Sequence, residues 1–167
     1  MTITMDASSR VDVIRIPDAR THEWTSDTAC RPQRVLIVDE HELVQAGLRA
    51  LLSGESWVAS CFTAGSAEMA VEVARRTQPQ LILLSMSVRG RSGLELCREL
   101  RARLPLAKIV LMSAEGRVST SLGQAHGAVG FIPQGLPAST IIATVKRAAE
   151  GEKVFPKAVD GDRRTAL

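Results

Sequence analysis

Residues Leu81–Glu95 read LILLSMSVRGRSGLE, and the rest of the fold can be worked out from this stretch. Four consecutive aliphatic residues end at Ser85, and a short loop containing Gly90 leads to a helix start at Ser92. A short apolar run bounded by loop residues is typical of a strand buried on both faces of a parallel sheet. The working side chains of open α/β sheets lie just beyond the carboxyl ends of such strands, so Ser85 is a candidate site residue.

The same alternation of a short apolar strand and a helix recurs along the chain. Strands are predicted at residues 35–38, 57–62, 81–84, 108–113 and 128–132, and helices at 43–52, 66–74, 92–104, 117–125 and 137–148. Met69 is predicted to face inward from the second helix. Five strand–helix units in strict alternation predict a parallel sheet, because right-handed crossovers leave few other topologies. We therefore predict an α/β, doubly wound, flavodoxin-like fold with strand order 2-1-3-4-5 and helices on both faces.

Composition limits the class of protein. The chain has 167 residues, 45% of them hydrophobic and 23% charged, which predicts one domain, at residues 33–155. Residues 1–32 are predicted to be a flexible arm, and residues 156–167 a tail or the start of a linker. The net charge is only +3 and aromatic residues make up 3%, so neither charge nor base stacking argues for nucleic-acid binding. Three cysteines without C-x-x-C spacing, and no apolar run long enough for a membrane span, favour a cytoplasmic protein without membrane contact.

Polar residues follow the predicted strands at the points where the strands end. Asp39 and Glu40 follow the first strand, Ser85 follows the third, and Ser113 is the last residue of the fourth. The predicted strand order brings these residues together beside the end of the fifth strand, at the switch point of the sheet. His41 is predicted to border the first helix, since a metal site would need a second histidine nearby.

At these positions the sequence resembles the receiver domain of bacterial response regulators. The segment VLIVDEHELVQAGLRALL, residues 35–52, is especially similar to the NarL/FixJ subfamily, and the resemblance extends over about residues 33–155. It implies that Asp39 and Glu40 form the Mg²⁺-binding acidic pair and that Ser113 senses the phosphoryl group. It also implies that Phe131 reports the switch state, with a plain core role as the alternative.

Two positions that the family uses for phosphorylation differ in this sequence. The family's phospho-acceptor aspartate corresponds to Ser85, and its lysine after the fifth strand corresponds to Gln134. Arg89 stands where the family usually has proline. A serine hydroxyl is a weak nucleophile without an adjacent base, and a glutamine offers a phosphoryl oxygen only neutral hydrogen bonds. The sequence therefore predicts an atypical receiver, a pseudo-receiver, that does not accept a phosphoryl group.

The remaining acidic pair permits different interpretations. Loss of a ligand carboxylate weakens a Mg²⁺ site, so no metal or other cofactor is expected, while weak Mg²⁺ binding at Asp39 and Glu40 stays open. Arg89 adds a positive charge beside these acids, and the hypothesis is that it pairs with one of them in place of the cation; the alternative is a solvated loop residue. Ser85 is interpreted as a space-filler, with a kinase target as the alternative.

These features favour an interaction module over an enzyme, because no nucleophile–base pair can be assembled at the predicted site. We expect a phosphorylation-independent receiver that regulates transcription through protein contacts, with DNA bound only by an output domain outside these residues. As receivers commonly do, it is expected to form a homodimer through the last helix with the helix at 43–52 or at 117–125. Ile141, Ile142 and Val145 cannot all face the sheet. The alternatives are a stand-alone interaction module and a receiver whose altered pocket binds a small molecule.

Overall fold

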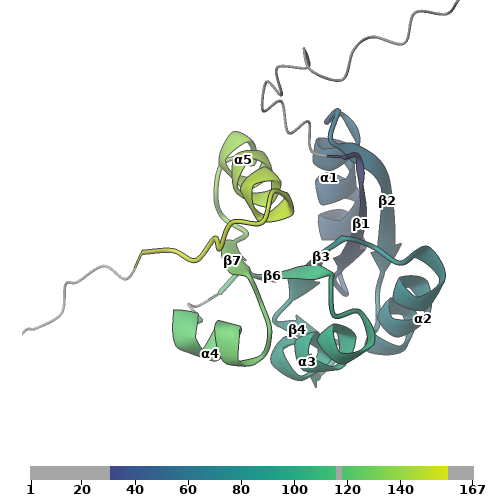
Figure 1. Ribbon diagram of the computed structural model, residues 1–167, viewed down its shortest axis with the longest axis vertical. Coiled ribbons are helices and arrows are strands. Elements are labelled where there is room, and N and C mark those ends of the chain that lie inside the picture. The colour runs from purple at the N-terminus through teal and green to yellow at the C-terminus, as the bar shows by residue number, and fades with distance from the viewer. Residues whose placement is uncertain (1–30, 116–117, 158–167) are drawn as a thin grey trace, which may run out of the picture.

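The computed structural model describes residues 31–115 and 118–157, so the predictions for the arm before residue 31 and for the tail after residue 157 lie outside the described residues. Five parallel strands form the central sheet (Figure 1), and their order is β2-β1-β3-β6-β7. This order confirms the predicted doubly wound, flavodoxin-like fold. The strands are β1 (Gln33–Val38), β2 (Val58–Ala64), β3 (Leu81–Ser85), β6 (Lys108–Ser113) and β7 (Gly130–Pro133).

Helices cover both faces of the sheet. They are α1 (Glu42–Ser53), α2 (Ala67–Thr77), α3 (Gly93–Arg103), α4 (Thr120–Ala125) and α5 (Ala138–Ala149). One hydrophobic cluster joins α2 and α3 to one face of the sheet, and a second cluster joins α1 and α5 to the other face (Figure 1). Alternate residues of each strand belong to the two clusters: Leu36 and Val38 to the first, Val35 and Ile37 to the second. Burial on both faces explains why these strands are continuous apolar runs in the sequence.

Side-chain caps fix where α2 and α3 begin, as Ser119 does for α4. The hydroxyl of Ser66 accepts a hydrogen bond from the backbone N–H of Met69 at 3.1 Å, and the hydroxyl of Ser92 accepts one from Glu95 at 3.5 Å. Both serines are the N-cap residues and stand where the sequence predicts these helices to begin; a serine oxygen satisfies one of the free N–H groups in the first turn. The cap at Ser92 sets the geometry of the loop after β3.

A short hairpin between β3 and α3 is not expected from the sequence. Its strands β4 (Ser87–Val88) and β5 (Arg91–Ser92) pair antiparallel. The two residues between them have positive φ angles, 48° at Arg89 and 77° at Gly90. Tight hairpins with positive φ at both central positions usually have Asn or Asp at the first, so an arginine there gives little sequence signal.

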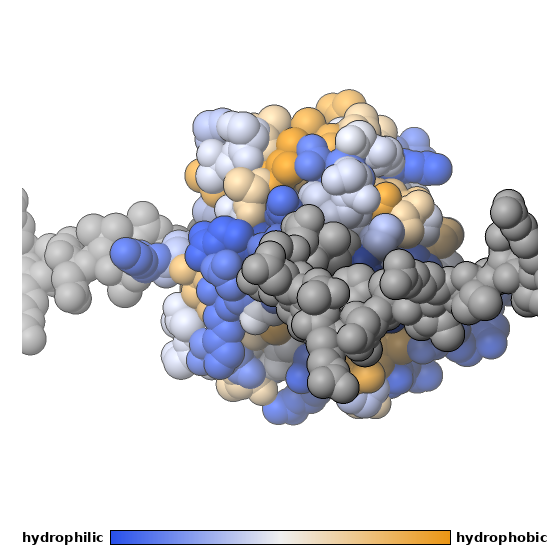
Figure 2. Space-filling model, turned by 45° about the horizontal axis from the view of Figure 1, so that its top comes forward, coloured by the Kyte–Doolittle hydropathy of each residue, from blue (hydrophilic) through white to orange (hydrophobic). Residues whose placement is uncertain are grey.

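Large apolar side chains are exposed at four places among the described residues: Leu43 is 85% exposed, Met69 51%, Leu106 93% and Leu122 43%. The prediction that Met69 faces inward is therefore wrong. Helix α2 instead buries small side chains against the sheet, namely Ala67, Ala70 and Ala74. On the face seen in Figure 2, hydrophobic residues form small groups separated by hydrophilic ones.

Candidate functional site

The carboxyl ends of the central strands bring the predicted site residues to one edge of the sheet. In the strand register, Val38 pairs with Leu84, so Asp39 and Ser85 both follow paired positions of β1 and β3. The backbone N–H of Gln134 donates to the carbonyl of Ser113 at 2.9 Å, which places the end of β7 beside the end of β6. The sequence prediction that these elements meet is confirmed by this pairing.

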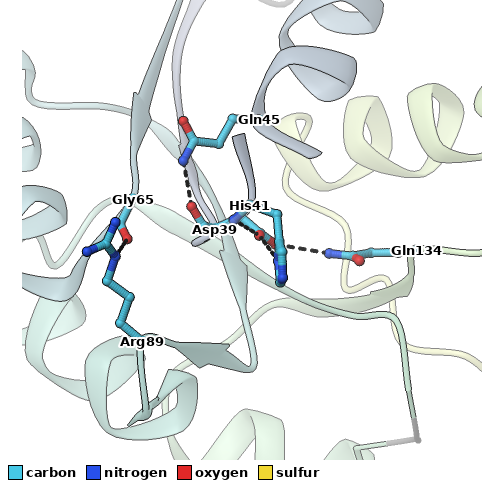
Figure 3. A network of polar contacts seen from close by, with 6 residues as sticks. All are labelled: Asp39, His41, Gln45, Gly65, Arg89 and Gln134. Atoms are coloured by element: carbon cyan, nitrogen blue, oxygen red, sulfur yellow. Dashed lines mark hydrogen bonds and ion pairs between the residues drawn. The ribbon is translucent and has the colours of Figure 1, made fainter. Parts of the chain in front are cut away.

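Asp39 is the only buried charged residue of the described chain, with 1% of its surface exposed. One carboxylate oxygen, Oδ1, accepts the backbone N–H of His41 at 2.8 Å and lies 3.0 Å from the ring Nδ1 of His41. The other oxygen, Oδ2, accepts the side-chain amide of Gln134 at 3.2 Å (Figure 3). A carboxylate can only accept, so the ring contact is a hydrogen bond when Nδ1 carries the proton.

These bonds satisfy a group that is costly to bury. An unpaired charge in a protein interior is strongly unfavourable, whereas a hydrogen-bonded one is tolerated. The donor to Oδ2 is the side-chain amide of Gln134. The donors to Oδ1 are the backbone N–H of His41 and its ring, and the His41 side chain is 70% exposed. Among the described residues, no lysine or arginine pairs with Asp39. At the position where the family has a lysine, a neutral amide thus donates to Asp39.

The backbone of Asp39 is held as firmly as its side chain. Its N–H donates to the carbonyl of Ala64 at 3.1 Å, and its carbonyl accepts the side-chain amide of Gln45 at 2.6 Å. Gln45 lies on α1, so this bond ties the helix to the end of β1. A Cβ atom at Gly65 would lie 3.3 Å from the same amide nitrogen, which leaves little space around it.

Arg89 has a different partner from the one hypothesised. Its Nε donates to the carbonyl of Gly65 at 3.0 Å (Figure 3), and within the described part of the chain it forms no ion pair with Asp39 or Glu40. The hypothesis that Arg89 takes the place of a cation beside the acids is wrong in this structure. Arg89 is an exposed turn residue of the β4–β5 hairpin, and the carbonyl next to β2 is the acceptor that it reaches.

Ser85 is half-buried, and the loop after β3 folds back closely against it. The N–H of Gly93 donates to the carbonyl of Met86 at 2.8 Å. A Cβ atom at position 93 would lie 2.2 Å from the carbonyl oxygen of Ser85, which only glycine avoids. In the described residues the Ser85 hydroxyl has no hydrogen bond to Asp39 or to any other group that could serve as a base. The arrangement therefore offers an unactivated hydroxyl at the acceptor position.

The structure shows the contacts of the two predicted switch residues, Ser113 and Phe131. The hydroxyl of Ser113 accepts the backbone N–H of Glu115 at 3.1 Å and also contacts the carbonyl oxygen of Glu115. Phe131 is 2% exposed and belongs to the core cluster on the α2–α3 face. The position of Phe131 in this structure therefore matches the alternative that it has a plain core role.

The residues at this edge do not fit the Mg²⁺ ion that the family implies. Mg²⁺ prefers a nearly ideal octahedron of oxygen ligands. Both oxygens of Asp39 already accept hydrogen bonds, and the last residue of β3, Ser85, has a hydroxyl instead of a carboxylate. Within residues 31–115 and 118–157, no group of three or more His, Cys, Asp or Glu side chains is arranged to hold a metal. The donor set lacks the third carboxylate.

The pairing of Gln134 with Asp39 is the feature that sequence reasoning missed. The sequence predicts Gln134 only as a lost lysine and His41 only as a helix border; His41 is indeed the N-cap residue of α1. The sequence does contain a signal, because a carboxylate at the end of a buried strand needs hydrogen-bond donors, and the amide of Gln134 after the last strand can provide one.

Comparison with known proteins supports the same family over most of the chain. Residues 35–146 match the family model of the response regulator receiver domain. The chain is 32% identical over 131 residues to the transcriptional regulatory protein MctR of Rhizobium johnstonii, covering 77% of this chain and 61% of that protein. It is 29% identical over 131 residues to the nitrate/nitrite response regulator protein NarL of Escherichia coli, covering 77% and 60%.

A solved structure shares the fold and part of the sequence. The crystal structure of a LuxR family DNA-binding response regulator from Silicibacter pomeroyi matches with a TM-score of 0.63 and 28% identity, covering 74% of this chain and 97% of that one. The chain spans about 60% of the length of the first curated relatives that it matches. None of the described helices is both long and apolar enough to cross a membrane.

Proposed function

Because the chain belongs to the response regulator receiver domain family, with relatives of the NarL and LuxR type, we propose that it is an atypical receiver that signals without aspartyl phosphorylation. The observation that carries the proposal is the closed hydrogen-bonding arrangement around Asp39, where Gln134 donates to Oδ2 at 3.2 Å. A hydroxyl stands at the acceptor position and a neutral amide at the lysine position. Neither group performs the phosphorylation chemistry of the family.

The proposed output is protein contact and not catalysis, and it needs no cofactor. With no phosphoryl group to accept, the domain is held in one arrangement by the bonds at Asp39, and its activity is set by concentration, partners or a ligand. Control of transcription then depends on an output domain beyond these residues, which would supply all DNA contact. We place this function in the cytoplasm, where receivers of this type meet their partners. A stand-alone interaction module would use the same surfaces.

A homodimer is proposed through α5 with α1 or α4, and the surface favours α1. A groove of about 270 Å³ runs between α1 and α5 and is lined by apolar residues such as Leu48, Leu51 and Ile141. Gly47 lies in the same groove, and a Cβ atom there would meet nothing within 4 Å, so a partner helix can approach closely. Leu43, one helical turn before Gly47, is 85% exposed.

Dimer formation is tested by sedimentation of the full chain and two variants. Leu43→Asp is expected to shift the protein to the monomer, because a charge replaces an apolar contact on the α1 face. Leu106→Asp is the matched control, since Leu106 is 93% exposed but lies outside α1, α4 and α5. A wild-type protein that is monomeric at every concentration would contradict the dimer proposal.

Phosphorylation independence is tested by incubation with Mg²⁺ and either acetyl phosphate or beryllofluoride, followed by intact mass measurement and sedimentation. The wild type is expected to show no adduct and no change in assembly. The double variant Ser85→Asp with Gln134→Lys restores both family residues and is expected to gain a phosphoryl adduct. Gln134→Lys alone is the control, because it restores the charge without an acceptor. A stoichiometric adduct on the wild type would overturn the proposal.

The groove between α1 and α5 also supports a second candidate, a receiver regulated by a small apolar ligand. Gln134 lines this groove and binds Asp39, so a ligand seated there would touch the hydrogen-bonding arrangement directly. Thermal-shift screening of the wild type against the Gln134→Leu variant tests this candidate. A ligand that stabilises only the wild type would support it.

A further inference from the structure

A second groove lies at the opposite edge of the sheet from Asp39 and Ser85. It has a volume of about 290 Å³ and is formed where β1, β3 and β6 begin, between the α2–β3 loop and the α3–β6 loop. A smaller hollow of about 80 Å³ continues it and shares Gln78, Arg103 and Leu104 with it. We refer to the two together as the arginine groove, because Arg34, Arg75 and Arg103 line it.

Two arginines at this edge are held in place by backbone carbonyls. The Nε of Arg34 donates to Thr77 at 2.8 Å and its Nη2 to Gln78 at 2.9 Å. Arg101 donates from Nη1 to the carbonyl of Ala107 at 3.0 Å. In the part of the chain that the structure describes, neither guanidinium has an acidic partner. The carboxyl end of α2 carries only about half a negative charge beside Arg34, so part of the positive charge of the guanidinium stays unbalanced. The hydrogen bonds to the carbonyls fix the orientation of this guanidinium.

The other arginines of this region share their acidic partners. Glu72 pairs with Arg75 at 2.9 Å and with Arg76 at 2.7 Å. Glu99 pairs with Arg103 at 3.3 Å and with Arg91 at 3.4 Å. Glu72 therefore balances only one of its two arginines, whereas Arg91 also pairs with a second acid, Glu68, at 3.7 Å. Exposed ion pairs of this kind are weak, so Arg75 and Arg103 can exchange them for a stronger carboxylate partner.

An uncovered leucine lies beside these charges. Leu106 is 93% exposed although it lines the groove, while Leu104, Pro79 and Ala107 form a buried apolar floor. An apolar recess ringed by arginines is the arrangement in which an apolar anchor with flanking carboxylates binds well. The groove contains no aromatic side chain on which a nucleic-acid base could stack.

We propose that the arginine groove binds an acidic segment of a partner protein, in which a leucine-like side chain is flanked by Asp or Glu. The apolar side chain enters the groove against Leu104 and Leu106. The flanking carboxylates pair with Arg75 and Arg103 and with the free Nη1 of Arg34. This contact is independent of the Ser85 edge and of the α1–α5 face, so the domain can hold this partner while it is a dimer.

Fluorescence anisotropy with defined probes tests the proposal on the full chain. The probe is a labelled peptide, Glu-Asp-Asp-Leu-Leu-Asp-Glu-Glu, and it is compared with the same peptide carrying serine for leucine and with one carrying lysine for every acid. The acidic leucine peptide is expected to bind, and both altered peptides are expected to bind at least about tenfold more weakly. Its affinity is expected to fall as salt is raised, because exposed charges are screened.

Matched variants locate the binding site. Arg75→Ala with Arg103→Ala, and separately Leu106→Ser, are each expected to weaken peptide binding about tenfold. The arginine variant leaves Glu72 paired with Arg76 and Glu99 paired with Arg91, so the fold is retained, as thermal unfolding would verify. Arg49→Ala and Leu43→Ser, which change exposed residues of α1, are expected to leave the affinity unchanged.

Three results would overturn the proposal. The first is no binding of the acidic leucine peptide at millimolar concentration. The second is equal loss of affinity in the α1 control variants. The third is a DNA duplex of equal charge that binds more tightly than the peptide and depends on the same arginines, which would assign the groove to nucleic acid.

Discussion

Replacement of Gln134 by leucine tests whether the amide holds the buried carboxylate of Asp39. In the described chain Gln134 is the only donor to Oδ2, and Asp39 is 1% exposed, so the variant leaves one oxygen of a buried carboxylate without a partner. Hydrogen bonds to charged groups contribute about 1.5–3 kcal/mol. The bond is long at 3.2 Å and Gln134 is half-buried, so we expect a loss of about 2 kcal/mol in the free energy of unfolding.

The assay is urea unfolding followed by circular dichroism, with calorimetry as the second measurement. A loss of about 2 kcal/mol corresponds to a fall in Tm of roughly 8 °C for a domain of this size. Gln124→Leu is the matched control, because Gln124 is an exposed residue of α4 with no side-chain hydrogen bond among the described residues. Gln134→Lys is expected to retain or raise stability, since a charge-assisted bond replaces the neutral one. If Gln134→Leu and Gln124→Leu change stability equally, the amide does not hold Asp39 and the reasoning is refuted.

Three other predictions concern packing and burial. Gly93→Ala is expected to lower the free energy of unfolding by about 3 kcal/mol, because the added Cβ would meet the Ser85 carbonyl oxygen at 2.2 Å. Gly47→Ala, where the added Cβ meets nothing within 4 Å, is expected to raise the free energy of unfolding by about 0.5–1 kcal/mol. Equal effects of the two variants in urea unfolding would contradict the close approach at Gly93. Phe131→Ala is expected to cost about 3–5 kcal/mol in the same assay, and a loss below about 1 kcal/mol would place Phe131 outside the core. Burial raises the pKa of Cys97 to about 11, so its thiolate is scarce at neutral pH. Iodoacetamide labelling of Cys97 at pH 8, followed by peptide mass mapping, is expected to be about a hundredfold slower in the folded protein than in the urea-unfolded protein, and to become faster as the pH rises. Equal rates in the folded and unfolded protein would show that the thiol is accessible.

Part of the candidate site follows from local sequence alone. A short apolar run that ends in a polar residue identifies a buried strand and its functional end, and this pattern is sufficient to select Asp39, Ser85 and Ser113. Residues 81–84 are fully buried, as their sequence indicates. The caps at Ser66 and Ser92 are predictable for the same reason, because a helix start is decided within one turn of the chain.

Other features depend on which segments meet in space. Gln134 is distant from Asp39 in the sequence and reaches it only because β7 ends beside β6 at the same edge of the sheet. Arg89 binds the carbonyl of Gly65 and not an acid, because the hairpin turn directs the chain toward the end of β2. Periodicity shows which residues must be buried, but it does not show which partner a buried polar group will find. The sequence by itself determined the five strands of the central sheet, their order and the residues at their ends. Only the tertiary structure decided the β4–β5 hairpin and the hydrogen-bond partners, since these are set by neighbours that the sheet order brings together.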